Sequence, residues 1–403
     1  MNKNKEKVPK IRFPGFTEPW EQRKLGDVVS YIVDNRGKNP TYYCSEGIPV
    51  IDNFMIKNTL YPELGTATRF IDEELYQNFI RKYNEIDDIL LTLVGNGIGN
   101  ISLFPADKAV IIQNTLGLRT DENKRFLFFL LMSKNQEIVK LDRGMAQPSI
   151  RQDEILDISI KIPKMEEQEK IGTYFSNLDN LITLHQRKLN HLKDKKKGLL
   201  QKMFPKNGEL VPELRFPEFT DPWEQRKVGE FLTESKIKGS DGSKAKKLTV
   251  KLWRKGIVPK EEIYQGSSAT QYYVRKSGQF MYGKLDFLNQ AFGIVPPELD
   301  GYESTLDSPA FDFKDGINSG FFLEYISLKR FYKYQGNTAN GSRKAKRIHA
   351  DTFFEMPISV PRHDEQKKIG SFFQNIDNLI TLHQRKLDHL KEQKKALLQQ
   401  MFI

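Results

Sequence analysis

Residues 163–204 read PKMEEQEKIGTYFSNLDNLITLHQRKLNHLKDKKKGLLQKMF, and residues 361–402 repeat them as PRHDEQKKIGSFFQNIDNLITLHQRKLDHLKEQKKALLQQMF. Most aligned positions are identical. Each copy begins with a proline, carries acidic residues near its start and has lysines near its end, which complements a helix dipole. Pro205 and Gly208 follow the first copy as helix stop signals. The sequence therefore predicts two long, nearly identical helices.

Apolar residues in each copy recur at alternating steps of four and three, which places them in one seam along a helix. We expect the two helices to pack antiparallel on each other; the alternative is that each packs on its own domain. In full overlap His185 would face Lys394, and Lys196 would face His383. The predicted coiled-coil seam consists of Leu178, Ile182, His185, Leu189, Leu192, Leu199, Ile376, Ile380, His383, Leu387, Leu390 and Leu397.

Two glycines, Gly172 and Gly370, interrupt the helical sequence at matching places, which predicts a kink or a close approach of another backbone. His185 and His191 are six residues apart and so face different sides of a helix, unlike the i, i+4 pair that binds zinc. We therefore expect no metal site here.

A second repeat precedes each helix. Residues 8–26, VPKIRFPGFTEPWEQRKLG, return at 211–229 as VPELRFPEFTDPWEQRKVG, whereas residues 27–162 and 230–360 align only in patches. The chain is thus a duplicated frame with two different inserts. Matching frames suit a partner present in two identical copies, and unlike inserts suit one ligand with two unlike parts.

The composition describes a basic globular protein. A chain of 403 residues accommodates two domains, and 38% apolar with 29% charged residues is a globular balance. The net charge of +11 favours phosphate-rich partners. The sequence has no apolar run long enough for a membrane span and no secretory signal after Met1, and the single Cys44 fits a reducing compartment. We expect a cytoplasmic protein.

The two helices also agree at polar positions outside the seam. A recent duplication could leave such agreement by chance, but the inserts have diverged far. We therefore predict that these faces dock a partner that binds twice. The predicted docking residues are Asn177, Asp179, Gln186, Arg187, Asn375, Asp377, Gln384 and Arg385.

Both inserts follow a mixed α/β plan. Insert one has strand-like runs at 89–94 and 110–113, turn signals at 36–40 and 95–100, a helix near 125–141, a polar loop at 144–152 and a strand at 155–162. Insert two ends comparably, with the loop GSRKAKR at 341–347 and a strand at 354–360. Similar plans with different loop chemistry are typical of two recognition domains with different targets.

Reading DNA requires donors and acceptors on loops that can enter a groove, above all Arg, Lys, Asn and Gln. Each such residue alone could be a solvated surface side chain, but together they mark matching loops. The predicted DNA-binding residues are Arg36, Lys38, Asn39, Asn96, Asn100, Gln113, Asn114, Arg143, Gln147, Ser149, Arg151, Lys251, Arg254, Lys255, Lys284, Gln290, Asn318, Arg343, Lys344, Lys346 and Arg347. For the aromatic residues of insert two, such as Phe280 and Tyr282, we expect core packing rather than base stacking.

At these residues the chain resembles the specificity subunit of type I restriction-modification systems over essentially its whole length. The resemblance rests on FPxFTxPWEQRKxG twice, on EQxKIGxxFxNxDNLITLHQRKLxHL twice, and in insert two on YYVRKSGQFMYGKLDFLNQAFGIVPPELDGYESTLDSPAF with the following GSRKAKR. It implies that each insert is a target recognition domain for one half of a bipartite asymmetric DNA site. It also implies helices that set the spacer, two docked methyltransferase subunits and ATP-dependent restriction subunits.

The resemblance gives this domain plan: target recognition domain one at 1–162 with a basic N-terminal arm, the central helix at 163–204, a linker at 205–216, target recognition domain two at 217–360, and the C-terminal helix at 361–403. The fold class is α+β, with two mixed α/β domains joined by an antiparallel coiled coil with pseudo-two-fold symmetry.

We expect no catalysis by this chain. NPTY at 39–42 lacks the second proline of an adenine methyltransferase site, and GNGIGN at 95–100 is not followed by a helix as a dinucleotide site requires. The resemblance assigns S-adenosylmethionine, ATP and Mg²⁺ to the partner subunits and no cofactor to this chain. The alternatives are a self-sufficient enzyme and a coiled-coil scaffold that does not read DNA.

Overall fold

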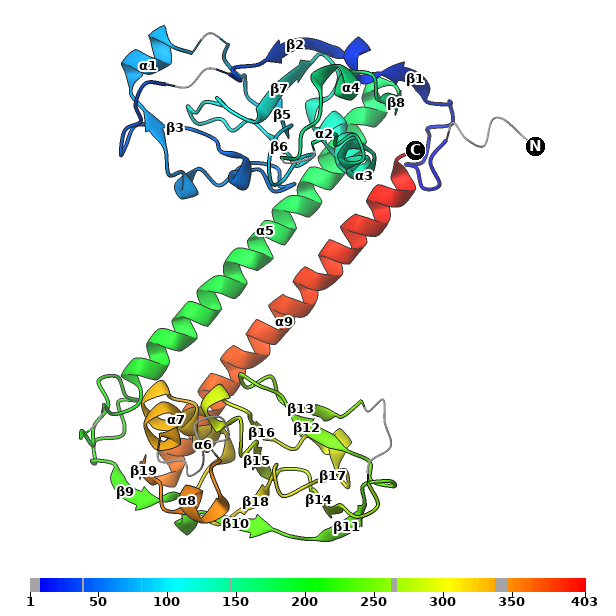
Figure 1. Ribbon diagram of the computed structural model, residues 1–403. Helices are drawn as coiled ribbons and strands as arrows, with labels where there is room; N and C mark the ends of the chain where they lie inside the picture. Colours follow the sequence, from blue (N-terminus) through cyan, green and yellow to red (C-terminus); the bar gives the residue numbers. More distant parts are fainter. Residues whose placement is uncertain are drawn as a thin grey trace. The chain divides into compact units, whose positions relative to one another are not determined.

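The computed structural model describes residues 8–37, 40–80, 82–144, 147–206, 208–261, 267–337 and 347–403. The chain divides into two compact units, Met1–Arg187 with Gln384–Ile403, and Lys188–His383 (Figure 1). Two long helices, α5 (Met165–Lys202) and α9 (His363–Met401), are each divided between the two units. No helix among the described residues combines the length and apolar character needed to cross a bilayer.

The first unit is built on an antiparallel sheet with the strand order β2-β7-β5-β6. The buried helix α2 packs into its core, with every side chain from Phe126 to Leu131 inaccessible to solvent. Its elements are β1 (Glu21–Lys24), β2 (Val29–Val33), β3 (Ile48–Pro49), β4 (Phe70–Ile71), α1 (Glu73–Asn78), β5 (Ile89–Thr92), β6 (Ile101–Leu103), β7 (Thr115–Thr120), α2 (Lys124–Ser133), α3 (Asn135–Val139), α4 (Gln152–Leu156) and β8 (Ser159–Ile162).

The second unit repeats this plan with the sheet β10-β18-β15-β16 and adds the smaller sheet β11-β14-β17 and the hairpin β12-β13. Its elements are β9 (Glu224–Lys227), β10 (Leu232–Ser235), β11 (Lys238–Asp241), β12 (Leu248–Val250), β13 (Ile257–Pro259), β14 (Gln271–Val274), β15 (Phe280–Tyr282), β16 (Phe292–Ile294), β17 (Glu303–Ser304), β18 (Ala310–Phe313), α6 (Ser319–Ile326), α7 (Lys329–Gly336), α8 (Ala350–Phe354) and β19 (Pro357–Val360).

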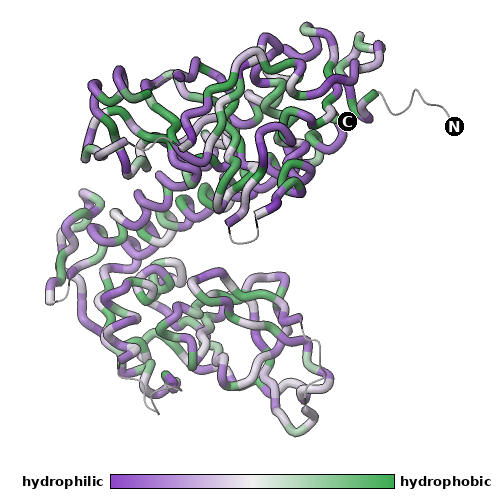
Figure 2. The backbone as a smooth tube through the Cα atoms, turned by 45° about the horizontal axis from the view of Figure 1, so that its top comes forward, coloured by the Kyte–Doolittle hydropathy of each residue, from purple (hydrophilic) through white to green (hydrophobic). Residues whose placement is uncertain are grey.

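Each unit has its own hydrophobic core, and Figure 2 shows apolar segments running through both. The second core is rich in aromatic rings, including Phe280 and Tyr282, which are fully buried. The expectation that these rings pack in a core is confirmed.

The two long helices run antiparallel in each unit (Figure 1). In the first unit Asp179 pairs with Lys394, and Phe175 of α5 contacts Phe402 just beyond the end of α9. In the second unit Lys196 pairs with Asp377, and Phe204 just beyond α5 contacts Phe373 of α9. Rising residue numbers along one helix meet falling numbers along the other, as predicted.

The predicted register of the seam is wrong. Lys394 pairs with Asp179 rather than facing His185, and Lys196 pairs with Asp377 rather than facing His383. The reason is electrostatic, because a largely buried ammonium group requires an anionic partner and a histidine side chain carries no negative charge.

The seam residues nevertheless lie on the covered side of the helices. The buried members are Leu178, Leu189, Ile376, Leu387 and Leu390. The half-buried members are Ile182, His185, Leu192, Leu199, Ile380, His383 and Leu397.

The two interrupting glycines mark a close approach of another element, as predicted. A Cβ atom at Gly172 would lie 2.7 Å from Oδ1 of Asn123 and 3.0 Å from the backbone nitrogen of Phe126, both at the start of α2. A Cβ atom at Gly370 would likewise collide with Asn318 and lie 3.0 Å from the nitrogen of Phe321. In each unit the long helix therefore crosses the N-terminus of a core helix.

Several predicted element boundaries are wrong. The expected helix at 125–141 divides into α2 and α3, and the expected strands at 155–162 and 354–360 each begin with the end of a short helix, α4 or α8. Residues 110–113 are not a strand; Val110 forms only an isolated bridge with Val50. The turn at 95–100 is confirmed, with positive φ angles at all three of its glycines.

Candidate nucleic-acid interface

One end of the first unit's sheet collects most of the candidate residues from insert one. Because neighbouring strands are antiparallel, β2 and β5 end where β6 and β7 begin. Arg36 follows β2, the turn at 95–100 joins β5 to β6, and Gln113 and Asn114 precede β7. The backbone nitrogen of Gly95 donates to the carbonyl of Pro148 at 2.8 Å, which fixes the 147–151 segment beside them.

Some of these side chains build the loops themselves. The Asn100 side chain donates to the carbonyl of Ile56 at 3.0 Å and accepts from Asn58 at 3.1 Å. Gln113 accepts from Arg69 at 3.4 Å. Asn96 and Gln147, in contrast, are exposed. At this end of the sheet, side-chain hydrogen bonds fix the turns, and the turns carry exposed amide side chains.

Three arginines at the same end form local ion pairs. Arg36 lies 2.8 Å from Asp34, Arg151 lies 2.7 Å from Asp153, and Arg143 contacts Glu154. Hydrogen bonding from the paired arginine lowers the pKa of both aspartates. Arg143 and Arg151 are largely exposed, and exposed ion pairs are worth at most about 1 kcal/mol, so an anionic ligand can displace their carboxylates. Arg36 and Asp34 are only 25% and 26% exposed, so that pair is held more firmly.

The loop at 142–149 is held by one carboxylate. Asp142 accepts from the backbone nitrogens of Gly144 at 2.9 Å and Ser149 at 2.8 Å, and these bonds lower its pKa. Ser149 also forms a bridge with Val94. The loop is therefore tied at both ends to the candidate surface.

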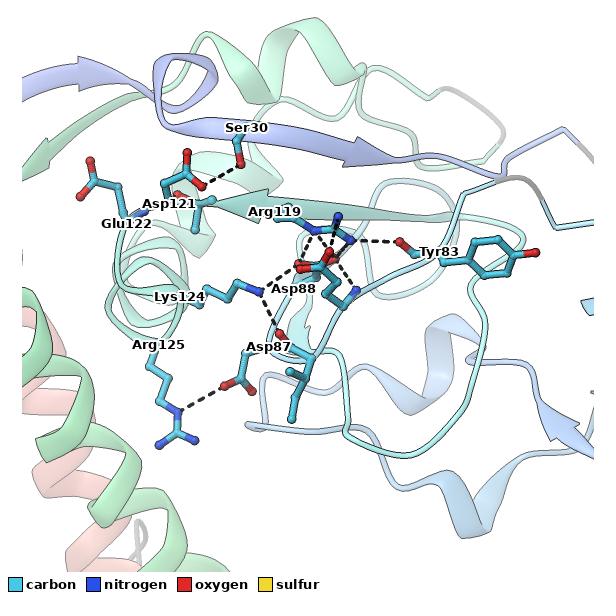
Figure 3. A network of polar contacts seen from close by, with 12 residues as sticks. Ser30, Tyr83, Asp87, Asp88, Arg119, Asp121, Glu122, Lys124 and Arg125 are labelled. Carbon is cyan, nitrogen blue, oxygen red and sulfur yellow. Dashed lines mark hydrogen bonds and ion pairs between the residues drawn. The ribbon is translucent and has the colours of Figure 1, made fainter. Parts of the chain in front are cut away.

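The opposite end of the sheet is charged but internally neutralised (Figure 3). Buried Asp88 accepts from Arg119 at 3.0 Å and lies 3.3 Å from Lys124, while Arg125 lies 3.7 Å from Asp87. Arg119 also pairs with Glu85 at 2.8 Å, so the three cations Arg119, Lys124 and Arg125 face the three carboxylates of Glu85, Asp87 and Asp88 and leave little net charge there. This end therefore does not belong to the candidate interface.

The corresponding end of the second sheet collects candidates from insert two. Lys284 and Gln290 lie between β15 and β16, and the backbone of Lys284 bonds both to Asp307 before β18 and to Ile348. Arg347 forms an ion pair with Asp307 at 3.4 Å. Partial burial lowers the pKa of Lys284.

The turn of the β12-β13 hairpin lies beside this end. The backbone nitrogens of Trp253 and Arg254 donate to the carbonyls of Asn289 and Gln290 at 2.8 and 3.0 Å. Arg254 makes a bidentate bond to buried Glu324, at 2.7 and 2.8 Å, so its guanidinium fixes the turn. Lys251 and Lys255 remain exposed.

Sequence reasoning missed Trp253, which is 56% exposed and has a φ of 58°. A large exposed aromatic side chain between two lysines, on a turn held in a left-handed conformation, is an unusual surface feature. The available signal was the run KLWRKG, a tryptophan within a basic turn.

Asn318 lies apart from the other candidates. It follows the far end of β18, and its Oδ1 accepts from the backbone nitrogen of Phe321 at 3.0 Å as the N-cap of α6. Asn318 therefore does not belong to the candidate interface. Five predicted residues lie outside the described part of the chain: Lys38, Asn39, Arg343, Lys344 and Lys346.

The predicted docking residues divide into two groups. Asp179 and Asp377 form the ion pairs between the helices. The others are exposed or half-buried on the helix surfaces: Asn177, Gln186, Arg187, Asn375, Gln384 and Arg385. Within the described residues, no group of three or more His, Cys, Asp or Glu side chains is arranged to hold a metal.

The two units thus share a common framework and carry different polar loops. The chain matches the model of the type I restriction modification DNA specificity domain at residues 17–194 and 310–392 and belongs to that family.

Similar proteins support this assignment. The MjaVIII specificity subunit of the type I restriction enzyme from Methanocaldococcus jannaschii is 24% identical, and the alignment covers 94% of this chain and 91% of that protein. The putative MjaX specificity subunit of the same organism is also 24% identical, with 98% and 95% covered. The crystal structure of a type I S subunit from M. genitalium shares the fold, with a TM-score of 0.62, 14% identity and coverage of 98% and 99%.

Proposed function

We propose that each unit of this chain reads one half of a bipartite, asymmetric DNA site. The supporting observation is that the two units have equivalent frames and unlike loops. Arg12 binds Glu167 in the first unit as Arg215 binds Glu365 in the second, in both cases through two bonds of 2.6 to 2.7 Å. An unchanged frame with different loops suits one assembly that recognises two different base sequences.

The frame contacts continue into the helices. The side chain of Gln168 accepts from the backbone of Asn123 and donates to the carbonyl of Pro163, and Gln366 repeats both bonds with Asn318 and Pro361. We infer that this repeated frame docks two copies of a methyltransferase subunit. The length of α5 and α9 then sets the unread spacer.

In this proposal the chain supplies recognition and no catalytic groups. S-adenosylmethionine would bind to the methyltransferase subunits, and ATP with Mg²⁺ to the restriction subunits. On the DNA side, the arginines and exposed amides of insert one and the basic hairpin turn of insert two would contact phosphates and base edges.

The test is to purify the chain with the methyltransferase subunit encoded beside it and to map methylated adenines in the host genome. The proposal expects a two-part motif separated by unspecified bases. A continuous motif, or methylation without sequence preference, would contradict it. A scaffold without DNA recognition would show the second outcome, and methyl transfer by the purified chain alone would indicate an enzyme.

A further inference from the structure

Each unit has a cavity at the same position of the repeated frame. In the first unit it measures about 390 Å³ and lies against Gln22 of β1 and Ser159 and Lys161 of β8. In the second it measures about 500 Å³ and lies against Gln225 of β9 and Pro357 and Ser359 of β19. The strand pairing is the same, because Gln22 faces Lys161 as Gln225 faces Ser359.

The other walls of the two cavities also correspond. The first is closed by Lys134 and Glu137, at the junction of α2 and α3, and by Ile403 beyond the end of α9. The second is closed by residues of α7, including Arg330 and Phe331, and by Pro205 beyond the end of α5. Both cavities thus lie where the repeated frame meets an insert: their position recurs, although insert residues supply most of each lining. A position that recurs in both units suits a ligand that is bound twice.

The lining of each cavity carries one more cationic than anionic side chain, and in the second cavity Lys206 also lies 3.7 Å from Glu213, which is outside the lining. Each lining contains two cationic side chains and one glutamate: Lys134, Lys161 and Glu137 in the first, and Lys206, Arg330 and Glu209 in the second. In the first cavity Lys134 pairs with Glu137 at 3.1 Å, with the glutamate largely exposed, so that this weak pair can be exchanged.

Arg330 is the most informative residue of the second cavity. Its Nη2 atom is buried and has no hydrogen-bond partner among the described residues. Burial also lowers its pKa. The side chain as a whole is half-buried, and Glu209 of the same cavity acts on it electrostatically. A buried donor atom without an acceptor is costly, and a bound ligand or an ordered water can supply the acceptor.

The remaining wall of the second cavity is apolar and aromatic, with Tyr325, Leu328 and Phe331. A carboxylate on a peptide segment can satisfy the guanidinium, and the side chains beside it can fill the aromatic part of the cavity. A lining with both charged and apolar walls therefore suits a peptide segment.

We propose that these two frame cavities each receive an acidic segment of one methyltransferase subunit, with Arg330 as the main carboxylate-binding residue of the second. This inference rests on the proposed function, because it requires a partner that binds twice. It adds two defined docking positions at the β1-β8 and β9-β19 strand pairs.

The test uses the full chain with the methyltransferase subunit and counts bound copies by native mass spectrometry. Arg330→Glu should weaken one copy by roughly tenfold or more, leaving one per chain at limiting concentration. Lys134→Glu with Lys161→Glu should remove the other copy, and all three together should remove both. Lys276→Glu, an exposed lysine of insert two outside both cavities and outside the repeated frame, is the matched control and should retain two copies.

A second variant separates docking from folding. Arg330→Met removes the unsatisfied cation, so the free chain should melt at the same or a higher temperature while the complex still loses one copy. A lower melting temperature with normal assembly would make Arg330 a structural residue and overturn the proposal. Two retained copies in Arg330→Glu would overturn it as well.

The remaining outcomes are also distinguishable. If Arg330→Glu keeps both copies but weakens DNA binding, the cavity is a phosphate site and the docking proposal fails. If the wild-type assembly methylates without a two-part motif, the proposed function fails, whatever the copy number of the variants.

Discussion

Nζ of Lys196 in α5 lies 2.7 Å from Oδ1 of Asp377 in α9, and both side chains belong to the second unit. Lys394 and Asp179 form the same bond in the first unit, also at 2.7 Å. Both ammonium groups also lie over a phenylalanine ring, Lys196 over Phe373 at 5.9 Å and Lys394 over Phe129 at 5.3 Å. The surroundings differ because Lys196 also pairs with Glu324 at 3.0 Å. Arg254 balances the additional carboxylate in the second unit.

The first prediction concerns the pair in the first unit, whose side chains are only 12% and 11% exposed. Burial raises the pKa of Asp179, and Lys394 opposes that shift. Asp179→Ala would leave the ammonium group unpaired and should lower the free energy of unfolding by about 3 kcal/mol. Asp179→Leu with Lys394→Met should be nearly neutral. Urea denaturation measures the free energy of unfolding of both variants. An equal loss of stability in the single and the double variant would contradict the claim that Asp179 stabilises the fold by neutralising Lys394.

The second prediction concerns the helix glycines. Gly172→Ala should destabilise the protein by about 1 to 3 kcal/mol, because the new methyl group would collide with the start of α2. Gly198→Ala in the same helix is the control. Its Cβ atom would meet nothing within 4 Å, so the change should stabilise the helix by roughly 0.5 to 1 kcal/mol. Thermal unfolding of both variants measures the contrast, and similar melting temperatures would contradict the close approach.

The third prediction concerns the β12-β13 turn. Trp253→Ala should leave the fold intact, because the side chain is 56% exposed, but should weaken DNA binding by the assembled complex by about 1 to 3 kcal/mol if the ring stacks on a base. Lys251→Gln with Lys255→Gln should reduce the salt dependence of binding, by roughly one unit of slope per phosphate contact. Lys367→Gln on α9 is the control. Fluorescence anisotropy at several salt concentrations provides the measurement, and unchanged binding would remove the turn from the interface.

The fourth prediction concerns pH. The backbone donors of Gly144 and Ser149 hold the pKa of Asp142 below its ordinary value of 3.8. A depressed carboxyl pKa gives a stabilising contribution that is complete above the unfolded value and is lost as the pH falls through the folded value. The amide resonances of Gly144 and Ser149 should therefore stay constant from neutral pH to the ordinary aspartate range and shift only below it. Asp142→Asn should shift them already at neutral pH.

The sequence predicted the architecture well because its main features are repeated. Two copies of one helix sequence indicated a pair, and the matched Gly172 and Gly370 indicated a close contact. The register was mispredicted because heptad spacing locates the apolar residues of a helix but not the ion-pair partners of its polar residues. Lys394 pairs with Asp179, a residue that was predicted to dock a partner instead.

The candidate site was only partly predictable. Residue type alone cannot separate a base-reading amide from one that caps a helix, as with Asn318, or an exposed arginine from one that fixes a turn, as with Arg254. Those differences depend on contacts far apart in the chain. The exposed Trp253 was missed because aromatic residues are usually part of the core, as Phe280 and Tyr282 are.

The most direct test of the central claim is to replace residues 230–360 with the corresponding insert of a relative that has a different target, and to map methylated adenines again. If each unit reads its own half-site, one half of the motif changes, and the other half stays as in the parent. A motif that changes in both halves, or in neither, would contradict the claim that the two inserts recognise DNA independently on a common frame.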